Sequence, residues 1–453
     1  MKKIDKHNLL ILRRKRERKR LKRLNNRHLY HNKYLVVDKV NAVLEKKDFL
    51  LIDKFESPLY KFLKSEGFIK NDVKTTKKII IPKDFSFQNN YVELINILKI
   101  FTATVFKRRR EVIIDFTNCK FVDQPALFIL QILRLSYLED IEKLSKKLSI
   151  LSVKVVITIL KSENEEVNKL LLINGLLSEA QLNKNGLMPI TTMGYFKGTK
   201  NQKHYADNQK GLICTRIVNY LDDCVSHHDY CFTPEGKNDF DGLISEILSN
   251  AEDHSPMNTY YVTANFLSEI GTDDGEAVGE VNLSFMNFGY SIFKGFEDSK
   301  EKNLDTYSVM EEMCERLSNN YQISFTKENL FTLYAIQDGI SRLKYEDESR
   351  GTGTIKFINS FFAFGDYEDF EKHYHPEMSI LSGSTHIICN NKYKPELKND
   401  IFVISLNAEN DLMVPPDEEC LKTVSHFFPG TLLFVRIYLN KQHITKKLDS
   451  SAS

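Results

Sequence analysis

Three polar side chains in the segment ISEILSNAEDHS (residues 244–255) have a spacing that could support chemistry. Glu246, Asn250 and His254 follow one another at intervals of four residues. Four residues turn a helix through about 400°, so the three side chains form one slowly drifting polar stripe. A carboxylate beside an amide can activate water or a hydroxyl and can hold a divalent cation through oxygen. A lone E-x-x-x-N, however, is also typical of the wet side of an ordinary amphipathic helix.

The fuller pattern E-I-L-S-N-A-E-D-H-S resembles the N box of the GHKL (Bergerat-fold) ATPases. This superfamily includes gyrase B, MutL, sensor histidine kinases and anti-sigma factor serine kinases, and the form E-x-x-x-N-A-x-x-H is most similar to the last group. The resemblance implies that Asn250 ligates Mg²⁺ and that Glu246 is the general base. It implies no firm role for His254 beyond shaping the site.

A second part of the resemblance lies where a predicted strand, 281–286, runs into the sequence N-F-G-Y-S at 287–291. GHKL proteins have D-x-G-x-G here, and the Asp accepts a hydrogen bond from the adenine amino group. The carbonyl of Asn287 can still accept that bond, although a neutral acceptor is weaker than an ionised one. The resemblance therefore implies adenine binding at Asn287 and Gly289 with reduced selectivity. A plain turn after a strand explains the same residues equally well.

A third part is the run SRGTGT at 349–354, which precedes a predicted helix over 355–362. Glycines before a helix let backbone N–H groups approach phosphate oxygens, and the helix N-terminus adds a favourable partial charge. The run resembles the G2 box of the family, and the charged segment 295–348 would then be the ATP lid. The residues that the resemblance assigns to the nucleotide here are Arg350, Gly351, Thr352 and Gly353.

Predicted strands and helices alternate over residues 77–185. The expected strands are 79–82, 112–116 and 153–160, and the expected helices are 91–106, 125–138 and 165–172, the last ending at Asn174–Gly175. Such alternation predicts a mixed or parallel sheet with helices packed on it.

The run VIIDFTNCKFVDQPALFIL in this region resembles the D-S-S-G-L signature of STAS domains, the module of anti-sigma factor antagonists. In that family a phosphorylatable hydroxyl follows the signature Asp. Here Gln124 follows Asp123, and a glutamine side chain has no hydroxyl to accept a phosphoryl group. The sequence therefore predicts a STAS-like domain that is not switched by phosphorylation at position 124.

The predicted fold class is α/β and α+β, with a STAS-like domain followed by a Bergerat-fold α/β sandwich. The rest of the sandwich would be a helix over 211–224, a hairpin whose first strand is 260–267 and whose turn is 271–280, and later strands 379–389, 401–406 and 431–439. The expected organisation is a basic arm (1–35), a helical segment (36–76), the STAS-like domain (77–185), a linker (186–205), the GHKL-type domain (206–442) and a tail (443–453).

The charge of the 453-residue chain is strongly asymmetric. Residues 1–35 carry 14 Lys or Arg and 2 acidic residues, whereas the remainder carries 49 basic and 59 acidic residues. Such an arm can neutralise the phosphates of a nucleic acid, an anionic membrane surface or an acidic protein, or can remain a solvated tail. The residues concerned lie at the start of its densest run and are Arg13, Arg14, Lys15, Arg16, Arg18, Lys19 and Arg20.

Cysteine usage and hydropathy indicate a cytoplasmic protein. The seven cysteines are scattered without a C-x-x-C pair, as expected for reduced thiols. The cluster Cys224, His227, His228 and Cys231 is too tight for the usual zinc spacing, and a helix end near a turn is the simpler interpretation. No apolar run approaches the roughly 18 residues that span a membrane.

Two functions agree with these patterns. The first is an ATP-binding, Mg²⁺-dependent regulatory ATPase or serine-kinase-like protein with a fused STAS-like domain, and the superfamily's nucleotide-driven dimerisation makes a homodimer an expectation by analogy. The alternative is a catalytically weak nucleotide-sensing scaffold whose basic arm binds nucleic acid or a partner protein.

Overall fold

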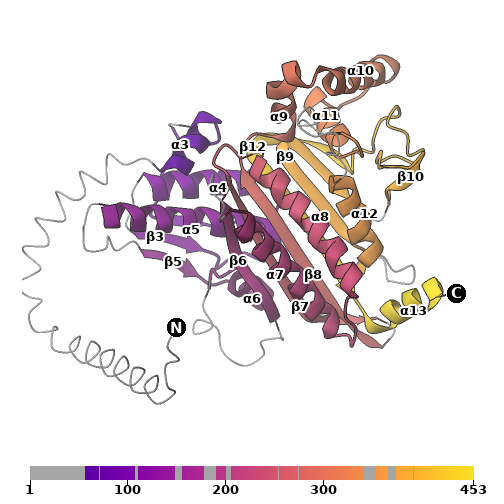
Figure 1. The fold of residues 1–453 in the computed structure, drawn as a ribbon. Coiled ribbons are helices and arrows are strands. Elements are labelled where there is room, and N and C mark those ends of the chain that lie inside the picture. The colour runs from indigo at the N-terminus through magenta and orange to yellow at the C-terminus, as the bar shows by residue number, and fades with distance from the viewer. Residues whose placement is uncertain are drawn as a thin grey trace, which may run out of the picture. The chain divides into compact units, whose positions relative to one another are not determined.

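The computed structural model describes residues 57–70, 72–107, 111–147, 156–177, 190–199, 206–253, 255–273, 275–340, 353–365, 374–390 and 392–452. The chain divides into two compact units. One unit comprises 58–139 with 154–453 and is shown as a ribbon in Figure 1. The other comprises 1–57 with 140–153, and the structure describes only residues 57 and 140–147 of it. The basic arm and His254 lie outside the described residues.

The first part of the larger unit has the predicted alternation of strands and helices. Its elements are α3 (Pro58–Ser65), β1 (Lys78–Ile80), β2 (Asp84–Phe85), α4 (Tyr91–Phe106), β3 (Glu111–Asp115), β4 (Phe121–Val122), α5 (Gln124–Lys147), β5 (Val156–Leu160) and α6 (Glu165–Ile173). Strands β1, β3 and β5 form a parallel sheet in that order, and β2 pairs with β4, also in parallel. The expected parallel sheet with helices is therefore confirmed.

Helix α5 begins at Gln124 because Asp123 caps it. The Asp123 carboxylate accepts hydrogen bonds from the backbone N–H groups of Ala126 at 2.9 Å and of Phe87 at 2.6 Å. Burial raises the pKa of Asp123 to about 6, even though these two N–H groups and the Arg436 guanidinium favour the charged form. Gln124 is itself buried, and its side-chain oxygen accepts a hydrogen bond from Asn174 at 2.8 Å.

A five-stranded antiparallel sheet organises the rest of the unit. Its strands, in spatial order, are β6 (Ile190–Thr199), β7 (Thr259–Asp273), β8 (Glu276–Phe288), β12 (Leu421–Leu439) and β9 (Glu377–Cys389). The structure corrects two predictions here. Residues 190–199 are an edge strand rather than part of a linker, and the turn of the β7–β8 hairpin spans only two residues. Gly275, at φ +79°, supplies the backbone conformation that so tight a turn needs.

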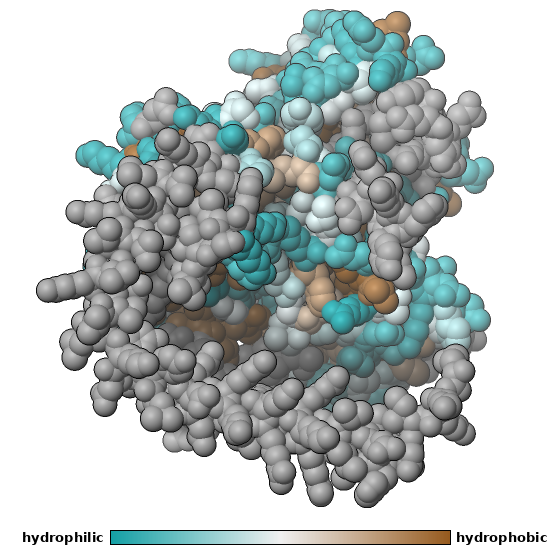
Figure 2. Space-filling view, turned by 60° about the vertical axis from the view of Figure 1, so that its left-hand side comes forward, coloured by the Kyte–Doolittle hydropathy of each residue, from teal (hydrophilic) through white to brown (hydrophobic). Residues whose placement is uncertain are grey.

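Helices α7 (Ala206–Ser226), α8 (Pro234–Asp253) and α12 (Gly353–Gly365) pack on one face of this sheet, and a later helix, α11 (Lys327–Ala335), packs on β9 and β12. Between β8 and α12 the chain forms α9 (Ile292–Ser299), a 3₁₀ turn (Lys300–Lys302), α10 (Leu304–Asn320) and α11. A small hairpin, β10 (Glu396–Lys398) with β11 (Ile401–Val403), precedes β12. Helix α10 lies at the top of Figure 1, and the top of Figure 2 is largely hydrophilic.

The C-terminal residues, predicted as a tail, form helix α13 (Lys441–Ala452). His443 lies 2.6 Å from Asp273 at the end of β7, and both side chains are buried. Lys441 pairs with Asp229, and the Tyr230 hydroxyl contacts that of Thr445 at 2.6 Å. These contacts join α13 to the β7–β8 hairpin and to the turn before α8. No helix in the described ranges is long and apolar enough to cross a membrane.

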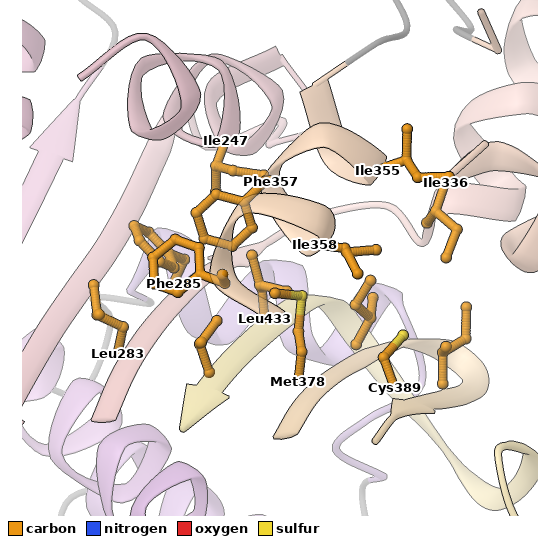
Figure 3. Packing of buried hydrophobic residues seen from close by; sticks show 14 of the residues in the cluster. Ile247, Leu283, Phe285, Ile336, Ile355, Phe357, Ile358, Met378, Cys389 and Leu433 are labelled. Atoms are coloured by element: carbon orange, nitrogen blue, oxygen red, sulfur yellow. The ribbon is translucent and has the colours of Figure 1, made fainter. Parts of the chain in front are cut away.

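The two faces of the sheet differ in chemistry. The face under α7, α8 and α12 is apolar; Figure 3 shows Leu283, Phe285 and Leu433 from β8 and β12 packed against side chains of the helices. The opposite face, which we call the far face, is mixed. It carries buried polar residues, among them Thr263, Asn265, Asn282 and Ser284, and buried apolar residues, among them Tyr261, Met286, Leu432 and Phe434.

Residues 58–177 cover the far face. Helix α4 packs on β12, and the Phe128 ring of α5 meets Tyr195 of β6 with 6.5 Å between ring centroids. Gln88 donates a hydrogen bond to Glu377 of β9. The five-stranded sheet is thus a middle layer between the apolar helices and the first part of the unit.

Candidate functional site

Glu246 and Asn250 lie one turn apart on α8, as the sequence predicts. Ile244, Ile247 and Leu248 form the buried side of the helix, because their spacing turns them toward the sheet. The side chains of Glu246 and Asn250 are half-buried. Neither side chain is hydrogen-bonded or ion-paired to another residue within the described ranges.

Asn287, at the end of β8, joins α8 to the sheet through a side-chain hydrogen bond. Its side-chain N–H donates to the carbonyl of Ala251, the residue after Asn250, at 3.0 Å. Its side-chain oxygen accepts the backbone N–H of Thr431 at 3.2 Å. Asn287 is 1% exposed, so this amide already has a structural role. Only the second lone pair of its oxygen remains for the predicted bond to adenine.

Gly289 directly follows β8 and is hydrogen-bonded to the segment of β12 beside it. Its backbone N–H donates to the carbonyl of Pro429 at 3.3 Å. Gly430, the next residue of β12, has φ +143°, and a Cβ atom there would lie 2.0 Å from the carbonyl oxygen of Asn287. The glycine of the P-G-T run at 429–431 is therefore required by a close backbone approach next to Asn287 and Gly289.

Helix α12 runs antiparallel to α8, which brings its N-terminus to the same place. Phe361, in the C-terminal half of α12, packs on Phe240 in the N-terminal half of α8, with centroids 5.7 Å apart. Phe357, one turn earlier, packs on Phe285 of β8 at 5.9 Å and lies beside Ile247 in Figure 3. Gly353 begins the helix about one further turn, or roughly 6 Å, along its axis.

The sequence-predicted residues thus converge. The end of α8 with Glu246 and Asn250, the end of β8 with Asn287 and Gly289, and the start of α12 at Gly353 share one end of the sheet. A helix N-terminus offers unpaired N–H groups and a positive partial charge to an anion. Oxygen atoms of a carboxylate and an amide suit a hard divalent cation. Of the other predicted phosphate contacts, Arg350, Gly351 and Thr352 lie outside the described residues.

The same end of the sheet contains a half-buried carboxylate that the sequence did not indicate. The Glu328 carboxylate of α11 accepts the backbone N–H of Ser384 in β9 at 3.0 Å, and burial raises the pKa of Glu328. Gly383 beside it has φ +61°, and a Cβ there would lie 2.0 Å from a Glu328 oxygen. The local sequence shows only the capping box of α11, T-K-E-N at 326–329, because the partner strand is 56 residues away.

The Cys/His cluster has no metal-site geometry. Cys224 is buried and Cys231 is exposed, while the His228 ring packs edge-on against Phe266. Burial lowers the pKa of His228. Across the part of the chain that the structure describes, no three His, Cys, Asp or Glu side chains are grouped to hold a metal ion. The simpler interpretation, a helix end approaching a turn, agrees with this arrangement.

Comparisons with protein-family models, with curated proteins and with solved structures found no match. Function must therefore be inferred from the residues and the geometry of this chain.

Proposed function

We propose that the chain binds ATP with Mg²⁺ where α8, β8 and α12 meet, and that it acts as a regulatory ATPase or serine-kinase-like protein with a fused STAS-like domain. The observation that carries the proposal is the antiparallel packing of α12 on α8. This packing directs the start of α12 toward the turn of α8 that bears Asn250. The hydrogen bond from Asn287 to Ala251 holds the same turn close to the end of β8, where Gly289 lies.

The order of elements also supports a Bergerat-type fold for residues 206–442. Two helices, an antiparallel hairpin, a helical insertion, a helix that starts at a glycine, and four further strands, two of which join the main sheet, follow one another along the chain. The N-box-like, G1-like and G2-like sequences fall at the end of α8, the end of β8 and the start of α12. The parallel β1–β3–β5 sheet with α4, α5 and α6 likewise supports a STAS-like fold for 77–185.

In this proposal each residue has a defined task. The Glu246 carboxylate accepts a proton from the attacking water or hydroxyl, and the Asn250 side-chain oxygen binds Mg²⁺. Backbone N–H groups of Gly351, Thr352 and Gly353, with Arg350, bind the phosphates, and the positive end of α12 adds to their attraction. Asn287 and Gly289 face the base. Bound Mg²⁺ would neutralise phosphate charge, and the half-buried oxygens of Glu246 and Asn250 suit this hard cation.

The test is to measure ATP·Mg²⁺ affinity by calorimetry and phosphate release on the same sample. Glu246→Gln should retain binding and lose at least about 100-fold in turnover, because a general base contributes that much or more. Asn250→Ala should lose the Mg²⁺ dependence of binding. Glu235→Gln, an exposed carboxylate in the first turn of the same helix, is the matched control. Wild-type turnover in Glu246→Gln would remove Glu246 from the mechanism.

The alternative, a nucleotide-sensing scaffold, is favoured by one observation. The Asn287 oxygen already accepts the Thr431 N–H, which leaves a neutral and partly used acceptor where the GHKL family has a carboxylate. Tight ATP binding without turnover in the wild-type protein would support the scaffold. In either case, deletion of residues 1–35 should abolish any salt-sensitive binding to nucleic acid, and unchanged binding would assign that contact elsewhere.

A further inference from the structure

The part of the unit that covers the far face contacts, through Tyr91, the segment of β12 that leads to the candidate site. This residue begins α4, and its hydroxyl donates a hydrogen bond to the backbone carbonyl of His426 at 2.6 Å, across 335 residues of sequence. Phe87 packs on the Tyr91 ring with 5.9 Å between centroids. Burial raises the pKa of Tyr91, so the hydroxyl stays protonated and remains a donor at physiological pH.

His426 lies in an irregular segment of β12. The pairing of β12 with β9 shifts register between Thr423 and Phe428 and again between Phe428 and Thr431. A bulge of this kind interrupts the regular ladder, so its backbone groups need other partners. The Tyr91 hydroxyl is the partner of the His426 carbonyl. Lys99 of α4 also faces this segment. Burial of the His426 ring lowers the pKa of His426, and the positive charge of Lys99 lowers it further.

The other end of the same segment is hydrogen-bonded to two residues of the candidate site, Gly289 and Asn287. Three residues after His426, the Pro429 carbonyl accepts the Gly289 N–H, and Thr431 donates its N–H to Asn287. The seven residues from Ser425 to Thr431 therefore have one anchor on α4 and two anchors on the residues proposed to face the nucleotide base. Between them, Phe428 pairs with Gly383 of β9, and Ser382 of β9 donates a hydrogen bond to the Gly430 carbonyl. We expect a change at the first anchor to reach the other two, because the segment is short and tightly packed at Gly430.

We propose that Tyr91 is a positioning residue for the nucleotide site. By holding the His426 carbonyl, it fixes the β12 bulge and with it the placement of Gly289 and Asn287, so the docked state of residues 58–139 controls nucleotide affinity. The link to affinity rests on the proposed function, whereas the mechanical link from Tyr91 to Gly289 does not.

The deciding variant is Tyr91→Phe, which removes one hydroxyl and keeps the ring. Tyr195→Phe is the matched control, because that hydroxyl lies on the same face of the sheet and has no hydrogen-bond partner among the described residues. Hydrogen exchange read by mass spectrometry on peptides 286–292 and 428–433 should be about 3- to 10-fold faster in Tyr91→Phe at the amides of Gly289 and Thr431. Exchange in α8 should not change, and Tyr195→Phe should match the wild type throughout.

The affinity for ATP·Mg²⁺ should fall about 3- to 10-fold in Tyr91→Phe, with turnover at saturating ATP unchanged. Wild-type exchange at both amides in Tyr91→Phe, or the same acceleration in Tyr195→Phe, would overturn the role of Tyr91. If the wild-type protein binds no ATP, the proposed function fails, and the exchange measurement alone still decides whether Tyr91 fixes Gly289.

Discussion

The two faces of the five-stranded sheet are built from alternate residues of the same strands, yet one is apolar and the other mixes polar with apolar residues. On one face Phe285 and its neighbours meet α8 and α12 through apolar contact. On the far face Asn265 is 0% exposed, and its side chain is bonded to Asn282 rather than to an apolar partner. Apolar burial stabilises by about 25 cal/mol per Å², whereas an internal hydrogen bond contributes only about 1 kcal/mol net. The helix-covered face should therefore contribute more stability per residue than the mixed far face, whose polar pairs mainly set the geometry of docking.

The largest effect is expected on the apolar face. Phe285→Ala should lower the free energy of unfolding by about 4 kcal/mol, because it removes a ring that is 2% exposed and leaves a cavity against Phe357. Urea denaturation followed by circular dichroism measures this. Phe285→Leu, which fills more of the space, should lose much less. A loss below about 1 kcal/mol for the alanine variant would contradict the proposed division of roles.

A pH-dependent effect should follow from His386 of β9, which points to the opposite side from Ile387. Burial, with the charge of Lys422 opposite, lowers the pKa of His386 to about 4 from 6.5. The unfolded state then binds a proton that the folded state does not, so stability is full above pH 6.5 and is lost as the pH falls toward 4. The loss should be about 3 kcal/mol over this range. His386→Gln should flatten this part of the stability profile, and an unchanged slope would show that other groups cause it.

A smaller effect is expected at Arg436 on the far face. Its guanidinium donates to Asn282 at 3.3 Å and lies 3.9 Å from Glu280, with Glu377 and Asp123 also close enough to interact. Arg436→Met should cost about 2 kcal/mol, since it leaves these carboxylates without a counter-charge, although the side chain is 25% exposed and therefore partly screened. The double variant with Glu280→Gln should recover part of the loss. Full stability of the single variant would mean that solvent already screens the cluster.

The smallest effect is expected at Ser284. Its hydroxyl is fully buried and has no hydrogen-bond partner among the described residues. Ser284→Ala removes a desolvated polar group without creating a large cavity, so the free energy of unfolding should change by no more than about 0.5 kcal/mol, toward greater stability. A clear loss of stability measured by thermal unfolding would reveal a hydrogen bond to this hydroxyl in solution. The far face would then contribute more to the free energy of unfolding than proposed.

Local periodicity was enough to predict much of the fold. Helix α4 has the predicted bounds, and α6 ends at Asn174 and Gly175, where φ is +68°. Strand β6 was missed because its glycines are typical of a linker. In the structure Gly198 is required by packing, since a Cβ there would lie 2.0 Å from the Tyr260 ring. That requirement comes from a strand about 60 residues away and has no local signal.

The same limit applies to the site. The four-residue spacing of Glu246 and Asn250 predicted their common side of α8 because helical geometry fixes it. The bonds from Asn287 to Ala251 and Thr431 join three separate elements, one of them 144 residues away, and no pattern within a single element encodes them. The residue type of Asn287 predicted that its side-chain oxygen can accept a hydrogen bond. Only the fold shows that this oxygen already accepts the backbone N–H of Thr431.

The position of β12 has a consequence for biosynthesis. It is made after β9, yet it lies between β8 and β9 and is the only described neighbour of β9 in this sheet. During translation β9 therefore emerges with no strand to pair with, and β8 presents an open edge until residue 439 has left the ribosome. Folding of this sheet must wait for β12 and should be slow, and a chain truncated before Leu421 should be insoluble or captured by chaperones.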